Sequence, residues 1–151
     1  MENLSPTLED YLETIYDLCA KDGIARVKDI AARLSVTNPS VVGAIKALKR
    51  RDLVRQERYG YVRLTDAGLQ MGASILHKHG VLAHFLETVL GLDPELASRD
   101  ACRLEHAVSP ETVRRLTAVA EFIRRETSAG TQGWKEAFQC FYRKRKGSRS
   151  P

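Results

Sequence analysis

The sequence is short of cysteine and of long apolar runs, and each shortage excludes a class of protein. Only three cysteines occur, at positions 19, 102 and 140, too few and too scattered for a disulfide-stapled secreted domain. No run of about eighteen apolar residues exists, so we expect no transmembrane helix. The first residues lack the basic and then apolar pattern of a secretory signal. We therefore expect a cytoplasmic protein with reduced thiols.

The sequence also lacks internal repeats, and no nucleophile and general base are arranged as in an enzyme. With 43% apolar and 28% charged residues among 151, the composition is that of an ordinary folded protein. This length suits one domain, or two small ones that share a core. We expect neither an enzyme nor a small-molecule substrate.

The net charge of +5 is unevenly distributed. Residues 26–63 hold seven more Lys and Arg than Asp and Glu, residues 131–151 hold five more, and the rest of the chain is acidic. Two basic regions on an otherwise acidic chain indicate a polyanionic partner that binds at defined places.

The apolar pattern predicts a mainly α-helical protein. Apolar residues repeat at three and four positions over 7–20, after a capping signal at Ser5 and before a stop at Gly23. Further helices are predicted near 27–34, 39–51, 94–107, 110–128 and 134–146, with a hairpin over 53–64. A long helix is predicted from 65 to about 77 or 78, and it either continues or restarts to reach 90. A flexible joint is expected at 128–133 and disorder at 147–151.

The helix, turn, helix and hairpin before residue 65 predict a winged helix-turn-helix. The helix predicted at 39–51 suits the major groove of DNA. Its first turn would contact base edges, and its basic residues would contact phosphates. A charge run is usually just a solvated face, and small polar residues at a helix start often serve only as caps. Here several cues agree on double-stranded DNA. The candidate contacts are Arg26, Thr37, Asn38, Pro39, Ser40, Lys46, Arg50, Arg58 and Tyr59.

A second group of residues has the chemistry of metal ligands. Cys102, Glu105 and His106 are three and four positions apart, so they share one face of a helix. Thiolate, carboxylate and imidazole are ligands of graded softness. Asp10 and Glu13 also lie one helical turn apart. Each residue alone has an ordinary explanation, such as an acid near a helix start or a small buried thiol.

Six stretches together resemble one family. They are TLEDYLETIY at 7–16, RVKDIAARL at 26–34, PSVV at 39–42, LTDAG at 64–68, HKH at 77–79 and ACRLEH at 101–106. On this combination, residues 5–128 resemble the iron- and manganese-dependent repressors, typified by the diphtheria toxin repressor and the manganese transport regulator. The resemblance implies a homodimer that binds a palindromic operator when metal is present and represses metal-uptake genes.

The resemblance also implies a domain organisation. A winged helix-turn-helix domain would span 1–66, and an all-helical metal-binding and dimerisation domain would span 67–130. A basic tail would follow over 131–151, without the SH3-like domain of longer members. Within the second domain, we expect 81–90 and 109–125 to form the dimer interface, and the alternative for any single residue there is a place in the intramolecular core.

Carried over by position, the resemblance gives the metal ligands Asp10, Glu13, His79, Cys102, Glu105 and His106. The two acids near the start resemble the manganese branch, whereas the cysteine resembles the iron branch. An accessory site of the iron branch would need ligands near Ala83 and Ser98, and neither side chain can serve.

We expect one or two divalent ions per subunit, Fe(II) or Mn(II), with the mixed donor set leaning slightly to Fe(II). Two alternatives stay open. One is a winged-helix regulator that responds to another effector or to oxidation of Cys102. The other is a metalloenzyme.

The sequence of the basic tail allows two interpretations. Trp134, Phe138, Phe141 and Tyr142 recur at helical spacing before the basic residues 143–146. We expect the aromatic residues to dock the segment on the protein body, which would allow the basic end to touch DNA. The alternative is that the whole segment frays.

Overall fold

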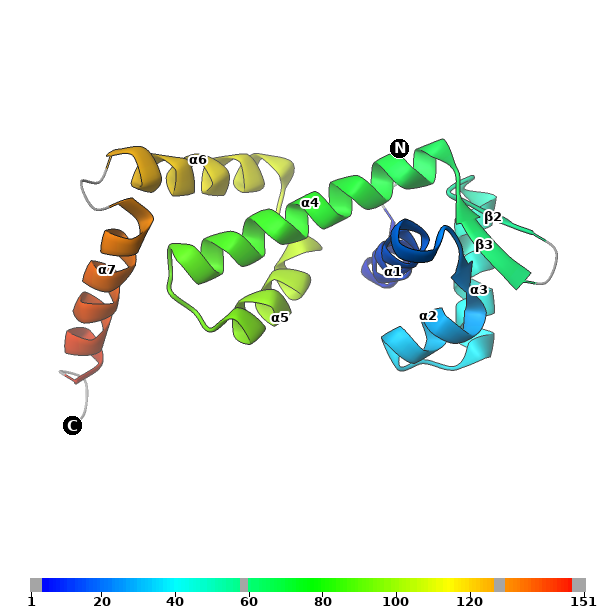
Figure 1. The fold of residues 1–151 in the computed structure, drawn as a ribbon, viewed down its shortest axis with the longest axis horizontal. Coiled ribbons are helices and arrows are strands. Elements are labelled where there is room, and N and C mark those ends of the chain that lie inside the picture. Colours follow the sequence, from blue (N-terminus) through cyan, green and yellow to red (C-terminus); the bar gives the residue numbers. More distant parts are fainter. Residues whose placement is uncertain (1–3, 58–59, 127–129, 148–151) are drawn as a thin grey trace. The chain divides into compact units, whose positions relative to one another are not determined.

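The computed structural model describes residues 4–57, 60–126 and 130–147. In these residues seven helices and three short strands follow one another along the chain (Figure 1). The chain divides into two compact units, Met1–Leu76 and His77–Pro151, and helix α4 (Asp66–Thr88) contributes residues to both. The prediction of a mainly helical protein is confirmed.

The first unit is a three-helix arrangement with a small sheet. Its elements are α1 (Pro6–Asp22), β1 (Ala25–Arg26), α2 (Val27–Leu34), α3 (Asn38–Arg50), β2 (Val54–Gln56) and β3 (Tyr61–Leu64). Strand β3 lies between β1 and β2 and is antiparallel to both. The hairpin is found where it was predicted. Strand β1 was not predicted, because a strand of two residues shows no periodicity.

The local signals around α1 act as the sequence predicted. The backbone N–H of Leu8 donates to the Ser5 side chain at 3.4 Å, which caps the start of the helix. Gly23 ends the helix with a φ of 75°, and its N–H donates to the Cys19 carbonyl at 2.8 Å.

The core of the first unit is formed by the apolar faces of α1, α2 and α3 against the sheet. Its fully buried side chains are Leu12, Ile15, Ile30, Val41, Ile45, Leu48, Val54 and Val62. Burial of one such side chain contributes about 1.5–3 kcal/mol. Because all three helices and the hairpin share this core, α3 is held against α1, α2 and β2.

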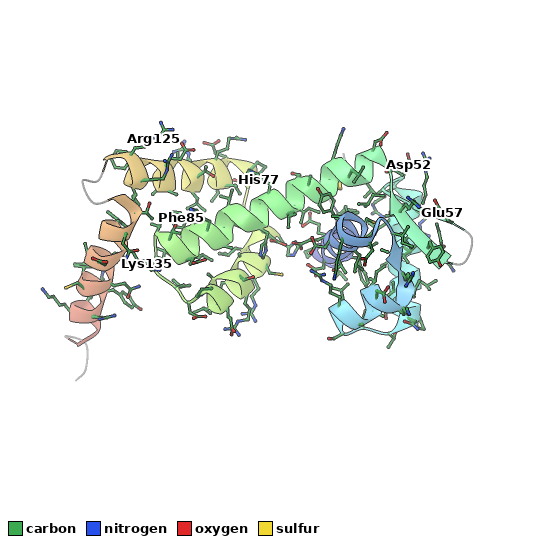
Figure 2. All side chains as sticks on the ribbon, in the orientation of Figure 1. Asp52, Glu57, His77, Phe85, Arg125 and Lys135 are labelled. Carbon is green, nitrogen blue, oxygen red and sulfur yellow. The ribbon has the colours of Figure 1, made fainter. Side chains whose placement is uncertain are left out.

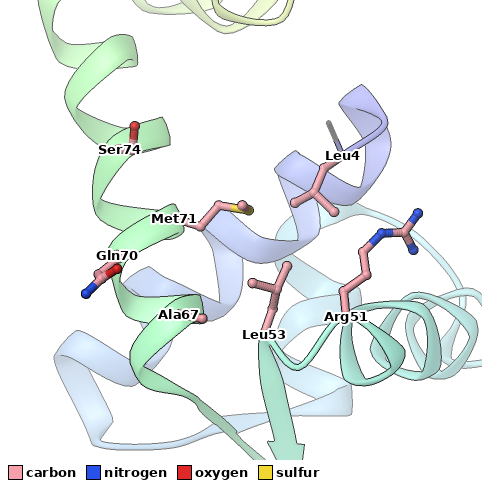
Figure 3. Close-up of a pocket in the computed structure, with 7 residues that line it drawn as sticks. All are labelled: Leu4, Arg51, Leu53, Ala67, Gln70, Met71 and Ser74. Atoms are coloured by element: carbon pink, nitrogen blue, oxygen red, sulfur yellow. The ribbon is translucent and has the colours of Figure 1, made fainter. Parts of the chain in front are cut away.

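An apolar cavity of about 520 Å³ also lies within the first unit (Figure 3). It is bounded by the segment before α1, the segment between α3 and β2, and the first part of α4. The residues that line it are Leu4, Arg51, Leu53, Ala67, Gln70, Met71 and Ser74. Nothing in the apolar periodicity indicated this cavity, because its walls come from three separate segments.

The second unit is all-helical over its described residues. It combines the later part of α4 with α5 (Pro94–Glu105), α6 (Pro110–Glu126) and α7 (Gly130–Gly147). Its buried apolar side chains include Leu82, Val89, Ala97, Ala101, Val113 and Ile123. No helix in the described ranges is long and apolar enough to cross a membrane.

Helix α7 begins earlier than the sequence predicted. We expected a flexible joint at 128–133, but 130–133 form the first turn of α7, so that expectation is wrong for these four residues. The side-chain amide of Gln132 donates to the Glu136 carboxylate at 2.8 Å, one turn further on. Residues 127–129 and 148–151 lie outside the described residues.

Side-chain hydrogen bonds dock α7 on the end of α4 and the turn that follows. Trp134 Nε1 donates to the Val89 carbonyl at 3.0 Å. Gln139 Nε2 donates to the carbonyls of Leu90 and Gly91 at 3.2 and 3.0 Å. Trp134 also stacks on Phe138, with the ring centroids 6.5 Å apart. Docking rather than fraying is therefore what the structure shows for this part of α7. The expectation that Phe141 and Tyr142 dock as well is wrong, because they are 60% and 54% exposed.

Candidate metal centre and nucleic-acid interface

The candidate metal centre is built around a buried carboxylate at the end of α5. Ala97, Ala101 and Glu105 are four residues apart and form the buried side of this helix. Glu105 thus follows two small buried alanines on the same side of α5. Its side chain is only 1% exposed. A buried carboxylate is costly unless cations or hydrogen-bond donors offset the lost hydration.

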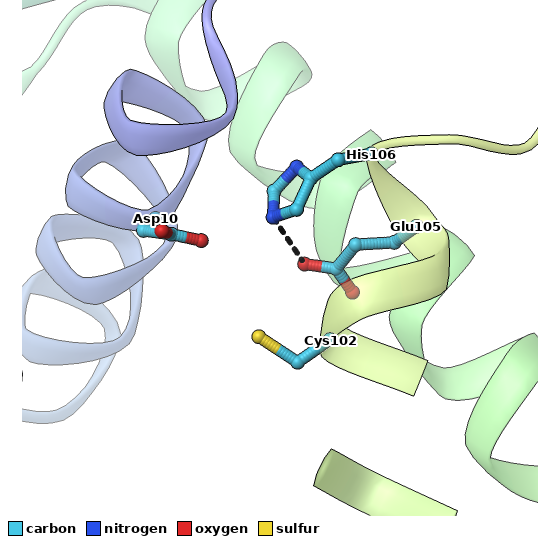
Figure 4. A group of neighbouring side chains, drawn as sticks. All are labelled: Asp10, Cys102, Glu105 and His106. Atoms are coloured by element: carbon cyan, nitrogen blue, oxygen red, sulfur yellow. Dashed lines mark ion pairs between the residues drawn. The ribbon is translucent and has the colours of Figure 1, made fainter. Parts of the chain in front are cut away.

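Two imidazoles lie beside the carboxylate of Glu105, one from α4 and one from the residue that follows Glu105 in the chain. His79 of α4 places Nδ1 2.7 Å from Glu105 Oε2. His106, which caps the end of α5, places Nε2 3.7 Å from Glu105 Oε1 (Figure 4). Lys78 Nζ donates to the Glu105 backbone carbonyl at 2.7 Å. Lys78 was not among the predicted site residues, although it lies inside the HKH stretch.

The thiol of Cys102 completes a cluster of three donor types. One ligand atom each of Cys102, Glu105 and His106 lies within 4.8 Å of the others, and Figure 4 shows the three side chains at the end of α5. Cys102 is exposed. It lines, with His79, Arg99 and Arg103, a hollow of about 760 Å³.

This arrangement fits a divalent cation. A cation held by thiolate, carboxylate and imidazole would balance the charge of the buried Glu105, and the hollow gives it a path from solvent. Four predicted ligands, His79, Cys102, Glu105 and His106, are thus brought together within the second unit.

The two remaining predicted ligands, Asp10 and Glu13, lie on α1 of the first unit. They are one helical turn apart, and each is partly buried. The fully buried side of α1 carries Leu12 and Ile15.

The candidate DNA-reading element is α3, whose two sides differ sharply. Val41, Ala44, Ile45 and Leu48 are buried in the core. The opposite side is exposed and holds Asn38, Pro39, Ser40, Val42, Gly43, Lys46, Lys49 and Arg50. This second side joins short residues near the helix start to cations near its end. A helix of this kind can enter the major groove, with its start near base edges and its cations near phosphates.

Thr37 and Ser40 are engaged with each other at the start of α3. The Ser40 N–H donates to Thr37 Oγ1 at 3.4 Å, and the two hydroxyl oxygens are 2.9 Å apart. Thr37 is therefore the N-cap of the helix. The capping role that the sequence left open is present, and both residues remain exposed.

The hairpin of β2 and β3, which is the wing of the winged helix-turn-helix, and the start of α2 form a second basic area. Arg26 precedes α2 and lies over the ring of Tyr61, 5.5 Å from its centroid. Together with Lys28 and Gly60 they line a hollow of about 430 Å³. Lys28 is a candidate that sequence reasoning missed, although it belongs to the RVKDIAARL stretch. The predicted contacts Arg58 and Tyr59 lie outside the described residues.

Comparison with known protein families covers both units. Residues 3–62 match the family model described as the iron-dependent repressor N-terminal DNA-binding domain. Residues 65–132 match the one described as the iron-dependent repressor metal-binding and dimerisation domain. The chain belongs to the iron-dependent repressor family. A curated relative is the transcriptional regulator MntR of Listeria monocytogenes, 35% identical over 125 residues, which are 83% of this chain and 87% of the relative.

Solved structures of this repressor family agree with the fold. The manganese regulator SloR matches with a TM-score of 0.69 and 32% identity over 80% of this chain and 56% of its own. The regulator ScaR with bound Zn²⁺ matches with a TM-score of 0.65 and 31% identity over 78% of this chain and 55% of its own. This repressor therefore spans little more than half the length of those two solved chains.

Family membership decides between the classes of function considered. The predicted fold class, a winged helix-turn-helix followed by an all-helical metal-binding and dimerisation domain, is confirmed. The chain is a metal-dependent, DNA-binding transcriptional regulator of the repressor class, and the metalloenzyme alternative does not hold.

Proposed function

We propose that this repressor acts as a homodimer that binds a palindromic operator when Fe(II) or Mn(II) is present and shuts off metal-uptake genes. The main supporting observation is Glu105, buried between His79 and His106 with the Cys102 thiol nearby. The same chain carries a winged helix-turn-helix with an exposed basic face. A regulator of this kind works where the DNA is, in the cytoplasm.

The ligand set has two parts. His79, Cys102, Glu105 and His106 would hold the ion, and Asp10 and Glu13 of α1 would supply further carboxylates. Six ligands exceed the needs of one tetrahedral ion, which is why we propose one or two ions per subunit. A bound ion would neutralise the buried carboxylate and link α1, beside the DNA-reading helix, to the dimerisation domain. Metal then raises operator affinity by the same factor by which the operator raises metal affinity.

The donor set bears on the choice of metal. Carboxylates suit Mn(II) and Fe(II), and the thiolate shifts the preference slightly to Fe(II). The relative SloR is described as a manganese regulator, and ScaR has been solved with Zn²⁺. Since Zn(II) outcompetes both metals at most such sites, binding alone does not reveal the signal. Operator binding at buffered metal concentrations does.

For DNA, we propose that the start of α3 meets base edges while the basic residues meet phosphates. The base-facing residues are Thr37, Asn38, Pro39 and Ser40. The phosphate contacts are Arg26, Lys28, Lys46 and Arg50, with Arg58 and Tyr59 at the wing tip. Residues 1–66 would form this DNA-binding domain, 67–130 the dimerisation domain and 131–151 a basic tail.

The proposed function is tested on an operator selected from random duplexes with Mn(II)-loaded protein. Operator affinity is then measured in chelator and at buffered Fe(II), Mn(II) and Zn(II). We expect tight binding only with metal. Cys102→Ala and Asp10→Ala should each weaken metal-dependent binding at least tenfold, about 1.4 kcal/mol.

Cys140→Ala is the matched control, because this exposed thiol lies outside the ligand set. Its operator affinity should equal that of the wild type. Operator binding that stays tight in chelator would refute the metal switch. A response to oxidant without metal, lost in Cys102→Ala, would instead identify a thiol switch.

A further inference from the structure

The exposed side of α7 carries an open hollow with three cations at its edge. The hollow measures about 510 Å³ and lies within the second unit. Lys135, Arg143 and Lys144 line it, together with Gln132, Glu136, Gln139 and Cys140. Lys135 is labelled on α7 in Figure 2. Neither the metal centre nor the winged helix uses these residues.

Some surface cations of the protein are paired with carboxylates. Arg33 is paired with Asp17 at 2.7 Å. Arg114 and Arg115 share Glu111 at 2.7 and 2.8 Å. Among the described residues, by contrast, Lys135, Arg143 and Lys144 form no ion pair. Three cations against the single carboxylate of Glu136, which accepts from Gln132, leave a net positive charge that favours an anionic ligand.

The amide groups in the hollow are already engaged. Gln132 donates to Glu136, and Gln139 donates to the carbonyls of Leu90 and Gly91. Recognition here therefore depends on charge rather than on an array of directed amide donors. A ligand recognised by charge alone, through Lys and Arg on one helix, is a phosphodiester backbone rather than a specific small molecule.

Helix α7, whose side chains line the hollow, is fixed on the rest of the second unit. The hydrogen bonds of Trp134 and Gln139 fix α7 on the end of α4, and α7 packs against α6. The cations of α7 are thus carried on a docked helix, which reduces the ordering cost of binding a polyanion.

We propose that this side of α7 binds the phosphate backbone of double-stranded DNA, independently of sequence and in addition to the winged helix. The proposal rests on the proposed DNA-binding function. It predicts that α7 adds to non-specific affinity and to its salt dependence without altering operator sequence preference or the response to metal.

The test measures binding of the full chain, in chelator, to a duplex of random sequence over a range of salt concentrations. The double variant Arg143→Gln/Lys144→Gln should lower the slope of log K against log salt by about 2, because each phosphate that is no longer neutralised lowers it by about 1. The control Arg114→Gln/Arg115→Gln removes the same charge from α6, where Glu111 already pairs both residues. Its slope should change by much less.

Unchanged slopes, or equal changes in both double variants, would overturn the proposal. Fluorescence of Trp134, the single tryptophan, verifies that α7 stays docked in each variant. If the Arg143/Lys144 variant keeps its DNA slope but loses binding to vesicles of anionic lipid, the surface is a lipid site and the proposal is wrong. Metal-dependent operator binding is measured in a separate experiment. The effect of the α7 variant can therefore be interpreted even if operator binding proves independent of metal.

Discussion

His79 and Glu105 come from different helices, 26 positions apart, and meet through a 2.7 Å contact between Nδ1 and Oε2. The contact joins α4 to α5 at a carboxylate that water does not reach. In the proposed metal site, His79 would orient the Glu105 carboxylate as well as serve as a ligand. Loss of His79 would deprive the buried Glu105 carboxylate of its nearest imidazole.

Glu105→Gln should remove most of the stabilisation that metal gives. Metal at about 100 times its Kd stabilises the folded wild type by about 2.7 kcal/mol, and a neutral amide is a poor ligand for the ion. Thermal unfolding with and without Mn(II) measures the difference. Glu95→Gln, an exposed change on the same helix, should keep the full metal effect. An equal metal effect in Glu105→Gln and wild type would exclude Glu105 as a ligand.

The three cysteines should differ in their rates of alkylation. Burial raises the pKa of the Cys19 thiol, which also donates to the Val62 carbonyl at 3.6 Å. Because the thiolate is the reactive form, Cys19 should react more slowly than the exposed Cys102 and Cys140, and faster as the pH rises. Metal should protect Cys102 alone. Mass spectrometry after iodoacetamide treatment measures each site, and metal protection of Cys140 would contradict the ligand assignment.

Thr37→Ala should lower the free energy of unfolding by about 1 kcal/mol, because α3 loses its cap. Thr37→Ser keeps the hydroxyl and should restore the stability. Denaturant unfolding measures this effect, and operator affinity is measured beside it. If the serine variant regains stability but not operator affinity, the threonine methyl group contributes to DNA recognition. If the alanine variant is as stable as wild type, the cap is without energetic importance.

Gly91→Ala should loosen α7. Gly91 has a φ of 68°, and a Cβ built on it would overlap the side-chain amide of Gln139. The substitution should shift the Trp134 fluorescence towards that of a solvent-exposed indole. Adding Gln139→Ala removes the overlap but not the backbone strain, so recovery should be partial. An unchanged spectrum in the single variant would show that this contact does not hold α7 in place.

Phe122→Asp should weaken the homodimer. Phe122 of α6 is 63% exposed and lies in the segment proposed for the interface. An exposed aromatic residue of this size commonly marks a protein contact, and a buried aspartate there would be strongly unfavourable. Phe141→Asp is the matched control, since Phe141 of α7 is 60% exposed. Sedimentation should show dissociation only for Phe122→Asp, and an intact dimer would move the interface elsewhere.

Much of the fold was predictable because its signals are local. Ser5 and Gly23 mark the two ends of α1, as the sequence predicted. Asp93, which was not singled out in the sequence, caps α5 by accepting from the N–H groups of Glu95 and Leu96. Strand β1 and the early start of α7 were not predictable. The strand depends on pairing with β3, which is distant in sequence. In the first turn of α7, two glycines in 130–133 obscured the helix signal.

For the candidate site, too, some properties could be predicted from the sequence and others could not. The sequence alone determined which chemical groups are present: the thiol, carboxylate and imidazole spacing on α5, the short residues at the start of α3 and the basic end of α7. Tertiary structure decided which of them are buried, which are adjacent and which are hydrogen-bonded. Glu105 lies on the buried side of α5 with Ala97 and Ala101 and contacts His79 there. The side-chain amide of Gln139 donates to a backbone carbonyl of the turn after α4, which the sequence did not reveal. Spacing along a helix specifies a face, but burial and pairing depend on what packs against that face.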